Sequence, residues 1–317
     1  MYPLKFAPQF FEKIWGGQKI KKIFSQTEKF ENIGEAWTLS AVLGNESVVE
    51  NGFLAENNLA ELCEVYLGDL LGEAVFEQYG SDFPLLVKII EARENLSIQV
   101  HPNDELAAER HNAFGKNELW YMLDCEPDAY IIAGFNRKIS EKEYLKAVKN
   151  NTIEDYLQKI PVKKGDAIFI PAGCIHAIGK GCMLLEIQQS SDITYRIYDY
   201  NRTDKNGEKR ELHTELAVDA VDFDNWKHNL INKIDYNIII NEYFTINEIY
   251  LDKNYNLELE NRNSFTLLCS VEGDFECRYN DKKIIVKKYE TILIPAEIHS
   301  INLLSNAPSK ILDVFVS

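Results

Sequence analysis

The amino-acid sequence predicts a mainly β protein made of two β-barrels with helical insertions. From Gly165 to His176, a glycine opens an apolar strand, a Pro-x-Gly turn ends it, and a histidine follows. Glycine permits the positive φ of a tight turn and proline ends ladder pairing, so this string is typical of a barrel rim that holds a metal. After about residue 235 the chain is almost wholly β-like. We therefore expect a metal-binding catalytic barrel within residues 1–234 and a second barrel within 235–317.

The second barrel is expected to have lost its metal site. Tyr289 to His299 repeats the earlier string, with a tyrosine in place of the opening glycine and a glutamate in place of the glycine after proline. No Gln-x-His or His-x-His pair precedes it. One histidine without companion ligands makes a poor metal site, so we expect His299 to be structural.

Two stretches of the first barrel predict helices. Residues 54–78 place apolar side chains three and four positions apart, as one or two amphipathic helices would. Residues 140–158 contain further helical pieces, and Ser140 with Glu143 forms the sequence pattern of a capping box. This second insertion is polar on one side and could form a flap over the mouth of the barrel.

Three segments offer candidate metal ligands. Residues two apart on a strand share a face, so Gln99 and His101 point the same way. By the same rule, Lys116 shares a face with Glu118. Together with His176, these segments supply an amide oxygen, two imidazoles and a carboxylate, which suit a borderline divalent ion. Taken singly, His101 could begin a turn and Glu118 could be a solvated strand-edge charge, but the joint pattern favours a metal site.

The net charge of −16 over 317 residues restricts the partners of this protein. An acidic chain without a concentrated basic patch is repelled by nucleic acid, so no nucleic-acid partner is expected. An anionic substrate requires that cations gather at the site, and Lys88, Lys116 and Arg196 are the candidates. Lys88 interrupts an apolar strand predicted over residues 84–92. It could snorkel from the strand edge, or it could point into the cavity with an anionic partner.

Targeting signals and cysteine usage indicate the compartment. The first residues lack the basic start and long apolar core of a signal peptide, and no run is long enough to span a membrane. The six cysteines form no Cys-x-x-Cys pair or disulfide framework, so they are expected to be reduced thiols. They are Cys63, Cys125, Cys174, Cys182, Cys269 and Cys277. We expect a cytoplasmic protein without a membrane partner.

Four segments of the chain resemble a known family. They are Trp15–Gly17, Gly34–Ser40, Ser97–Asn103 and Glu186–Asp199. With them the chain resembles the type I phosphomannose isomerases of the short bacterial kind, in the cupin superfamily, over most of its length. The string Ser-Ile-Gln-Val-His-Pro-Asn is the most specific part of the match. The resemblance implies cupin (jelly-roll) barrels and the interconversion of mannose 6-phosphate and fructose 6-phosphate.

The resemblance also implies the residues of the site. It places one zinc ion per chain on four ligands, and it places the catalytic arginine on Arg196. The four ligands are Gln99, His101, Glu118 and His176.

The chemistry of an aldose-ketose isomerase adds further candidates. The enzyme takes a proton from C2 and returns it to C1 through an enediolate, so it needs a base and a cation. Lys116 is the candidate base, because burial and a neighbouring cation both depress a lysine pKa. It could instead pair only with Glu118 or with the phosphate. Arg196 keeps its charge and suits binding the phosphate or stabilising the enediolate.

The strand before Arg196 supplies supporting candidates. Glu186 and Gln188 share its parity and could hold it in place, and Asp192 has the same parity on the same predicted strand. The candidate substrate-binding residues are Lys88, Asp192 and Glu186.

Two functions of other classes stay open. A non-catalytic sugar-binding or regulatory cupin would keep the barrel but would need neither Lys116 nor Arg196. A metal-dependent cupin oxidoreductase would use a redox metal and usually more histidines. For the chain itself we expect a monomer or a weak homodimer.

Overall fold

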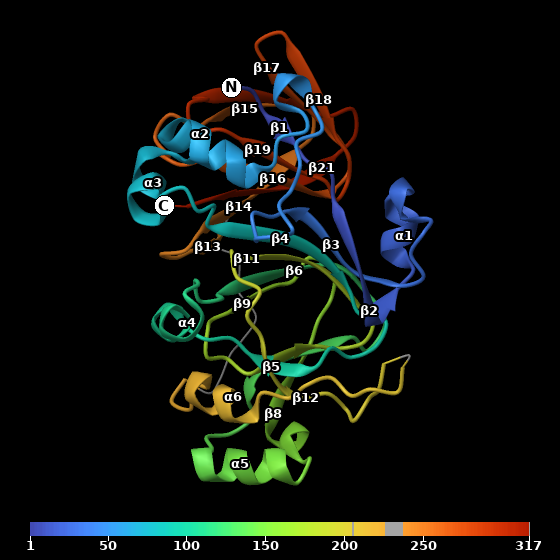
Figure 1. Cartoon of the computed structure of the whole chain (residues 1–317). Helices are drawn as coiled ribbons and strands as arrows, with labels where there is room; N and C mark the ends of the chain where they lie inside the picture. Colours follow the sequence, from blue (N-terminus) through green and yellow to red (C-terminus); the bar gives the residue numbers. More distant parts are fainter. Residues whose placement is uncertain (205, 226–236, 317) are drawn as a thin grey trace. The chain divides into compact units, whose positions relative to one another are not determined.

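The computed structural model describes residues 1–204, 206–225 and 237–316 and confirms the mainly β class (Figure 1). The described residues divide into two compact units. One unit comprises those within Met1–Gln9, Trp37–Val87 and Asn232–Ser317, and the other those within Phe10–Ala36 and Lys88–Ile231. The predicted boundary between residues 234 and 235 lies outside the described residues, and that division stays a prediction.

The unit that contains Lys88–Ile231 has a five-stranded sheet. The strand order is β12 (Tyr195–Tyr198), β5 (Ile98–Val100), β10 (His176–Ile178), β7 (Tyr130–Phe135) and β8 (Leu157–Pro161). Antiparallel pairing sets His176 opposite Gln99, and Gln99 opposite Arg196. Directly opposed residues point to the same face of a sheet. These three candidate residues therefore form one row across three neighbouring strands.

A second sheet has six strands. The order is β2 (Gln9–Gly17), β3 (Ile33–Leu39), β4 (Leu85–Glu91), β11 (Cys182–Gln189), β6 (Glu118–Cys125) and β9 (Ala167–Ile170), and the unit boundaries fall within β2, β3 and β4. On β6 and β11, Glu118 is opposite Gln188 and Trp120 is opposite Glu186. The pairing register thus gathers four polar or aromatic side chains on one face.

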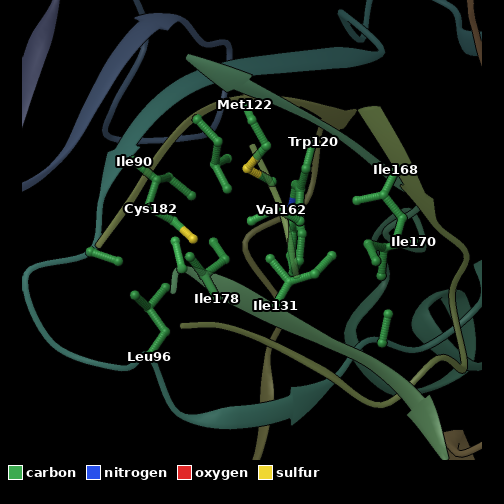
Figure 2. Packing of buried hydrophobic residues seen from close by; sticks show 14 of the residues in the cluster. Ile90, Leu96, Trp120, Met122, Ile131, Val162, Ile168, Ile170, Ile178 and Cys182 are labelled. Atoms are coloured by element: carbon green, nitrogen blue, oxygen red, sulfur yellow. The ribbon is translucent and has the colours of Figure 1, made fainter. Parts of the chain in front are cut away.

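An apolar cluster fills the space beside these polar residues. Figure 2 shows Trp120, Met122, Ile131 and Ile178 converging on one another, and all four are fully or almost fully buried. On β6, Glu118 precedes Trp120 and Met122 on the same face, and on β10 a histidine precedes Ile178 in the same way. Strand alternation therefore places Glu118 and His176 at one end of the apolar cluster.

Helices cover the other face of the five-stranded sheet (Figure 1). Val100 of β5 packs there in a second apolar cluster with Tyr144 of α5 (Glu141–Lys149) and Ala217 of α6 (Thr214–Ala220). Because Val100 adjoins Gln99 on its strand, this cluster lies on the face opposite to the candidate ligands.

The insertion of residues 140–158 forms the helix that the sequence predicts, but not in the predicted place. The capping box is confirmed, since the Ser140 side chain accepts from the Glu143 backbone and the Glu143 side chain accepts from the Ser140 backbone. The prediction of a flap over the site is wrong. Tyr144 and Ala147 are three positions apart, so they form one apolar face, and that face is buried against the outer side of the sheet.

The unit that contains the C-terminal strands also has two sheets. The six-stranded sheet has the order β1 (Leu4–Lys5), β19 (Thr291–Ile294), β16 (Thr266–Glu272), β21 (Ser309–Phe315), β14 (Thr245–Leu251) and β13 (Asn237–Ile240). The four-stranded sheet has the order β15 (Asn254–Glu258), β20 (Ser300–Leu304), β17 (Phe275–Tyr279) and β18 (Lys282–Val286). A buried cluster that includes Leu268, Phe275 and Ile301 draws side chains from both sheets.

The helices predicted over residues 54–78 are confirmed as α2 (Leu59–Leu71) and α3 (Glu73–Tyr79). They belong to this same unit. The end of α2 is fixed by backbone hydrogen bonds, from Phe265 N to Leu71 O at 2.9 Å and from Ala296 N to Leu70 O at 3.0 Å. Two further helices are α1 (Lys19–Ile23) and α4 (Asp104–His111).

Each of the four sheets ends in two edge strands within the described residues. The mainly β class is therefore shown, whereas closure into two barrels stays a prediction. Among the helices of the described chain, none is long and apolar enough to cross a membrane.

Candidate active site

Three predicted ligands come together in the structure. The ligand atoms of His101, Glu118 and His176 all lie within 4.8 Å of one another, and all three residues are buried. His101 Nε2 is 3.3 Å from Glu118 Oε1, and His176 Nε2 is 3.7 Å from Glu118 Oε2. The cluster could hold a metal ion.

Backbone carbonyls orient both imidazoles. His101 Nδ1 lies 2.8 Å from the carbonyl oxygen of Ile193, and His176 Nδ1 lies 2.8 Å from that of Cys174. Each carbonyl can only accept, so each Nδ1 carries the proton and each Nε2 presents a lone pair. Burial lowers the pKa of His101 well below its usual value, which keeps the ring neutral. A neutral imidazole held by its other nitrogen is the usual form of a metal ligand.

One oxygen of the Glu118 carboxylate can still accept a hydrogen bond or bind a cation. Glu118 is fully buried, and its Oε2 has no hydrogen-bond partner among the described residues. A buried carboxylate oxygen without a partner is costly unless a cation or a donor completes it. The donor set of one carboxylate and two imidazoles, with an orphaned oxygen, fits a borderline divalent ion such as zinc.

Gln99 lies beside this cluster, as predicted. Its Nε2 is 3.3 Å from His176 Nε2, and its Oε1 accepts from Ser97 Oγ at 3.5 Å. A half-turn of the amide would present the oxygen to the cluster instead. Its place as a fourth ligand stays a proposal.

Lys116 is buried against two of the candidate ligands. Its Nζ lies 3.1 Å from His101 Nε2 and donates to Glu118 Oε1. Burial lowers the pKa of Lys116 to about 7, and the charge of Lys88 lowers it as well. The structure thus brings the predicted base to the ligands. However, β6 begins at Glu118, so Lys116 lies two residues before the strand on which the prediction placed it.

Lys88 points inward, with anionic and polar partners. It is 6% exposed, its Nζ donates to Gln188 Oε1 at 2.8 Å, and it lies 3.3 Å from Glu186 Oε1. Snorkelling from the strand edge is thereby excluded. Burial alone would raise the pKa of Glu186, but the charges of Lys116 and Lys88 outweigh it and leave that pKa below its usual value.

The side-chain partners of Glu186 and Gln188 differ from the prediction. The sequence suggested that they hold Arg196, but their contacts are with Lys88 and with Trp120, whose Nε1 donates to Glu186 Oε2 at 2.9 Å. The cause is the pairing register, which puts Trp120 directly opposite Glu186. Local spacing contained no signal for this contact.

Arg196 stands at the edge of the row that contains Gln99. Its Nη1 donates to Glu211 O at 2.8 Å, and its backbone N donates to His213 Nδ1 at 3.0 Å. Its Nε is buried and has no hydrogen-bond partner within the described part of the chain. Burial lowers the pKa of Arg196, and the charge of Arg210 adds to the effect.

Asp192 differs from the prediction in its local structure. The strand begins at Tyr195, so the alternation that was used to place Asp192 on the face of Arg196 does not extend to it. Asp192 is exposed, and its negative charge raises the pKa of Lys116, against the larger effect of burial.

A network of hydrogen bonds that the sequence did not predict connects the segments that carry the candidate ligands. Asn117 Nδ2 donates to Gln189 Oε1 at 2.7 Å, and Asn117 Oδ1 accepts from Ala172 N at 2.9 Å. The backbone N of Gly173 donates to His101 O at 2.9 Å. These bonds tie the turn before His176 to the other two ligand segments.

The turn that leads to His176 has a counterpart in the other unit. Gly165 and Tyr289 both have positive φ, +88° and +74°. Gly165 N donates to Met122 O, and Tyr289 N donates to Ser270 O, both at 2.8 Å. The tyrosine therefore adopts the left-handed conformation that glycine favours, and the repeat that the sequence suggested is confirmed.

The strand register identifies the counterpart of Glu118. On β6, Glu118 is opposite Ile170, the residue before Pro171. On β16, Thr266 is opposite Ile294, the residue before the corresponding proline. Thr266 therefore takes the place of the carboxylate ligand.

The counterpart of His176 is Ser300. Each turn closes with a hydrogen bond to its proline carbonyl, of 3.1 Å at Pro171 and 3.0 Å at Pro295. His176 follows its proline by five positions, and so does Ser300. His299, which the sequence comparison matched to His176, lies one position earlier and is exposed. In this repeat of the turn, the hydroxyl residues Thr266 and Ser300 thus take the positions that Glu118 and His176 have in the other unit.

The fold and the site together define a mainly β protein with a buried His-Glu-His group that could hold a divalent metal beside two inward-facing lysines. The model of the family described as "Phosphomannose isomerase type I, catalytic domain" matches residues 3–133. The model described as "Mannose-6-phosphate isomerase, cupin domain" matches residues 234–308.

Similar proteins agree with these matches. The chain is 36% identical over 301 residues to mannose-6-phosphate isomerase ManA of Bacillus subtilis, covering 92% of this chain and 93% of the relative. It is 42% identical over 219 residues to mannose-6-phosphate isomerase of Streptococcus mutans, covering 69% and 67%. The crystal structure of mannose 6-phosphate isomerase from Bacillus subtilis matches with a TM-score of 0.88 and 32% identity, over 99% of each chain. The chain therefore belongs to the type I phosphomannose isomerases, a family of enzymes.

Proposed function

We propose that this chain is a zinc-dependent isomerase that interconverts mannose 6-phosphate and fructose 6-phosphate through an enediolate. The observation that carries the proposal is the buried group of His101, Glu118 and His176, with an orphaned carboxylate oxygen and with Lys116 in contact. The names of the relatives support the choice of substrate.

One zinc ion per chain would be held by Gln99, His101, Glu118 and His176. Bound there, the ion supplies positive charge that stabilises negative charge on the oxygens of the substrate. One carboxylate leaves such a site with net positive charge, which favours an anionic sugar phosphate.

Lys116 is the proposed base. In the neutral form it takes the proton from C2 of mannose 6-phosphate, and as an ammonium group it returns a proton to C1 of the enediolate. Its pKa of about 7 supports this role, because a large fraction of the amine is then neutral near neutral pH. In the competing role, Lys116 only pairs with Glu118 or with the phosphate. Exchange of the substrate C2 proton with solvent distinguishes the two roles, because only a base catalyses it.

The other candidate residues supply charge and position. Arg196 would stabilise the enediolate or bind the phosphate with its permanent charge. Lys88 would bind a substrate oxygen, with Glu186 holding its ammonium group at 3.3 Å. Asp192 is exposed, and its proposed contact is with the hydroxyl groups of the substrate.

Several broader features belong to the same proposal. Residues 1–234 would form the catalytic domain, and residues 235–317 would form a cupin domain without metal. The counterparts Thr266 and Ser300 support that difference, since neither hydroxyl is a usual zinc ligand. The protein would act in the cytoplasm as a monomer or weak homodimer.

A metal assay combined with a coupled assay tests this function. Purified protein is measured for zinc and for production of fructose 6-phosphate from mannose 6-phosphate, before and after chelation and again after zinc is restored. We expect turnover that is lost with the metal and recovered with zinc. Sugar binding without turnover would favour a regulatory cupin, and sugar-dependent oxygen consumption would favour an oxidoreductase. Either result would overturn the proposal.

A further inference from the structure

Cys125 and Cys182 lie directly opposite each other at the ends of β6 and β11. Both side chains contact the same apolar cluster, with Cys182 1% exposed and Cys125 partly buried. They are 57 positions apart in the chain, so their encounter depends on the pairing of the two strands. Neither thiol contributes to the site described above.

The hydrogen-bond pattern shows which kind of pair they form. Cys182 O accepts from Ala92 N at 2.9 Å, so the polar groups of Cys182 point away from β6. The next opposed residues are hydrogen-bonded, since Glu126 N donates to Gly181 O at 2.9 Å. Antiparallel ladders alternate, and Cys125 with Cys182 is therefore a non-hydrogen-bonded pair. In such pairs the Cα atoms are about 4.5 Å apart, which lies within the range that a disulfide spans.

The two thiols differ in their surroundings. The hydrogen bond from Cys182 lowers the pKa of Cys125, against the effects of burial and of the carboxylates of Asp124 and Asp166. The same hydrogen bond and burial raise the pKa of Cys182. Lys19, which lies 2.8 Å from Asp124 and 3.5 Å from Glu126, favours the thiolate of Cys125. The more accessible sulfur is thus the better nucleophile, and the buried one is placed to react second.

We propose that Cys125 and Cys182 form a site of reversible oxidation by hydroperoxides. The thiolate of Cys125 attacks the peroxide, so that a sulfur–oxygen bond forms, the oxygen–oxygen bond breaks, and the leaving oxygen departs as an alcohol or water after taking a proton. Cys125 is oxidised to a sulfenic acid. Cys182 then loses its proton and attacks that sulfur, and the displaced hydroxide leaves as water with this proton. The product is a cross-strand disulfide, which a dithiol reductant returns to two thiols.

Peroxide treatment of the reduced full chain, followed by thiol counting in denaturant and peptide mapping without reductant, tests this site. We expect the count to fall by two from the six thiols of the chain, with one linked peptide that joins Cys125 to Cys182. Dithiothreitol should restore the original count. Loss of no thiol, or linkage among other cysteines, would overturn the proposal.

Three variants assign the roles. Cys182→Ser should block the disulfide and leave Cys125 as a sulfenic acid that dimedone traps, whereas Cys125→Ser should give neither product. Cys277→Ser removes a buried thiol of the other unit and serves as the matched control, which should form the disulfide at the parent rate. Circular dichroism checks that each variant is folded. If Cys182→Ser does not fold, Cys182→Ala is used in its place. Dimedone labelling of Cys125→Ser that equals that of Cys182→Ser would contradict the assignment.

Discussion

Arg196 and Gln99 lie directly opposite each other on β12 and β5, and Gln99 is in turn opposite His176. Gln99, the candidate amide ligand, thus has His176 opposite it on one neighbouring strand and Arg196 opposite it on the other, and all three side chains start from the same face of the sheet. This row gives Arg196 a defined place beside the candidate metal site although no local sequence pattern connects the three residues.

Arg196→Ala should lower kcat by about 10²–10³-fold while zinc is retained, because the charge that stabilises the enediolate is lost and the ligands are intact. Arg196→Lys should recover only part of the rate, since an ammonium lacks the planar fork of the guanidinium. Steady-state kinetics and metal analysis on the same preparations check this. Loss of zinc in Arg196→Ala would show that the arginine supports the metal site instead.

His101→Ala and His176→Ala should each lose most of the bound zinc, which should be close to one ion per chain in the parent. Removal of one imidazole leaves Gln99, Glu118 and a single histidine, and such a set binds zinc far more weakly. Mass spectrometry of the dialysed protein measures the metal, and circular dichroism monitors the fold. Full zinc retention in both variants would refute the site.

His299→Ala is the matched control for those variants. His299 is exposed and does not take the place of His176 in the repeat, so zinc content and turnover should stay close to those of the parent. A loss of zinc here would mean that the metal binds in the other unit.

Lys116→Met should abolish exchange of the C2 proton of the substrate with solvent, because the proposed base is removed. In the parent, the rate should fall as the pH drops below about 7, by roughly tenfold per pH unit at the acid limit, since protonation of Lys116 converts the base to its inactive acid. Above that pH the amine is neutral and the rate should level off. Proton exchange followed by NMR decides the matter, and wild-type exchange in Lys116→Met would show that the base is another group.

Lys88→Met should destabilise the fold by about 3–5 kcal/mol, because it removes the cation that lies 3.3 Å from the buried Glu186 carboxylate and leaves Trp120 as its hydrogen-bond donor. The double variant Lys88→Met/Glu186→Gln should regain part of this free energy of unfolding. Lys138→Met, which breaks the exposed pair with Asp224, should cost about 1 kcal/mol or less. Urea unfolding gives the three values. Equal costs for the two single variants would show that the buried pair has no special role.

Much of the site could be predicted from spacing alone. Short-range spacing singled out His101, Glu118 and His176, and the structure brings their ligand atoms within 4.8 Å of one another, although β5 ends at Val100 and His101 lies just beyond it. The Ser140 capping box is local in the same sense, and its prediction is confirmed. The Gly165 turn is a third example, with the positive φ that its glycine suggested.

The tertiary structure decided which distant side chains meet. The register between β6 and β11 set Glu186 against Trp120 and Cys125 against Cys182, and a shift by one residue would have sent each to the other face. The sequence contains the residues of both pairs but no local signal for their register. For the same reason it could not place α5 on the outer face, or show that Ser300 and not His299 corresponds to His176. Local periodicity determined the faces of the strands, whereas the partners across strands depend on long-range pairing that only the folded chain fixes.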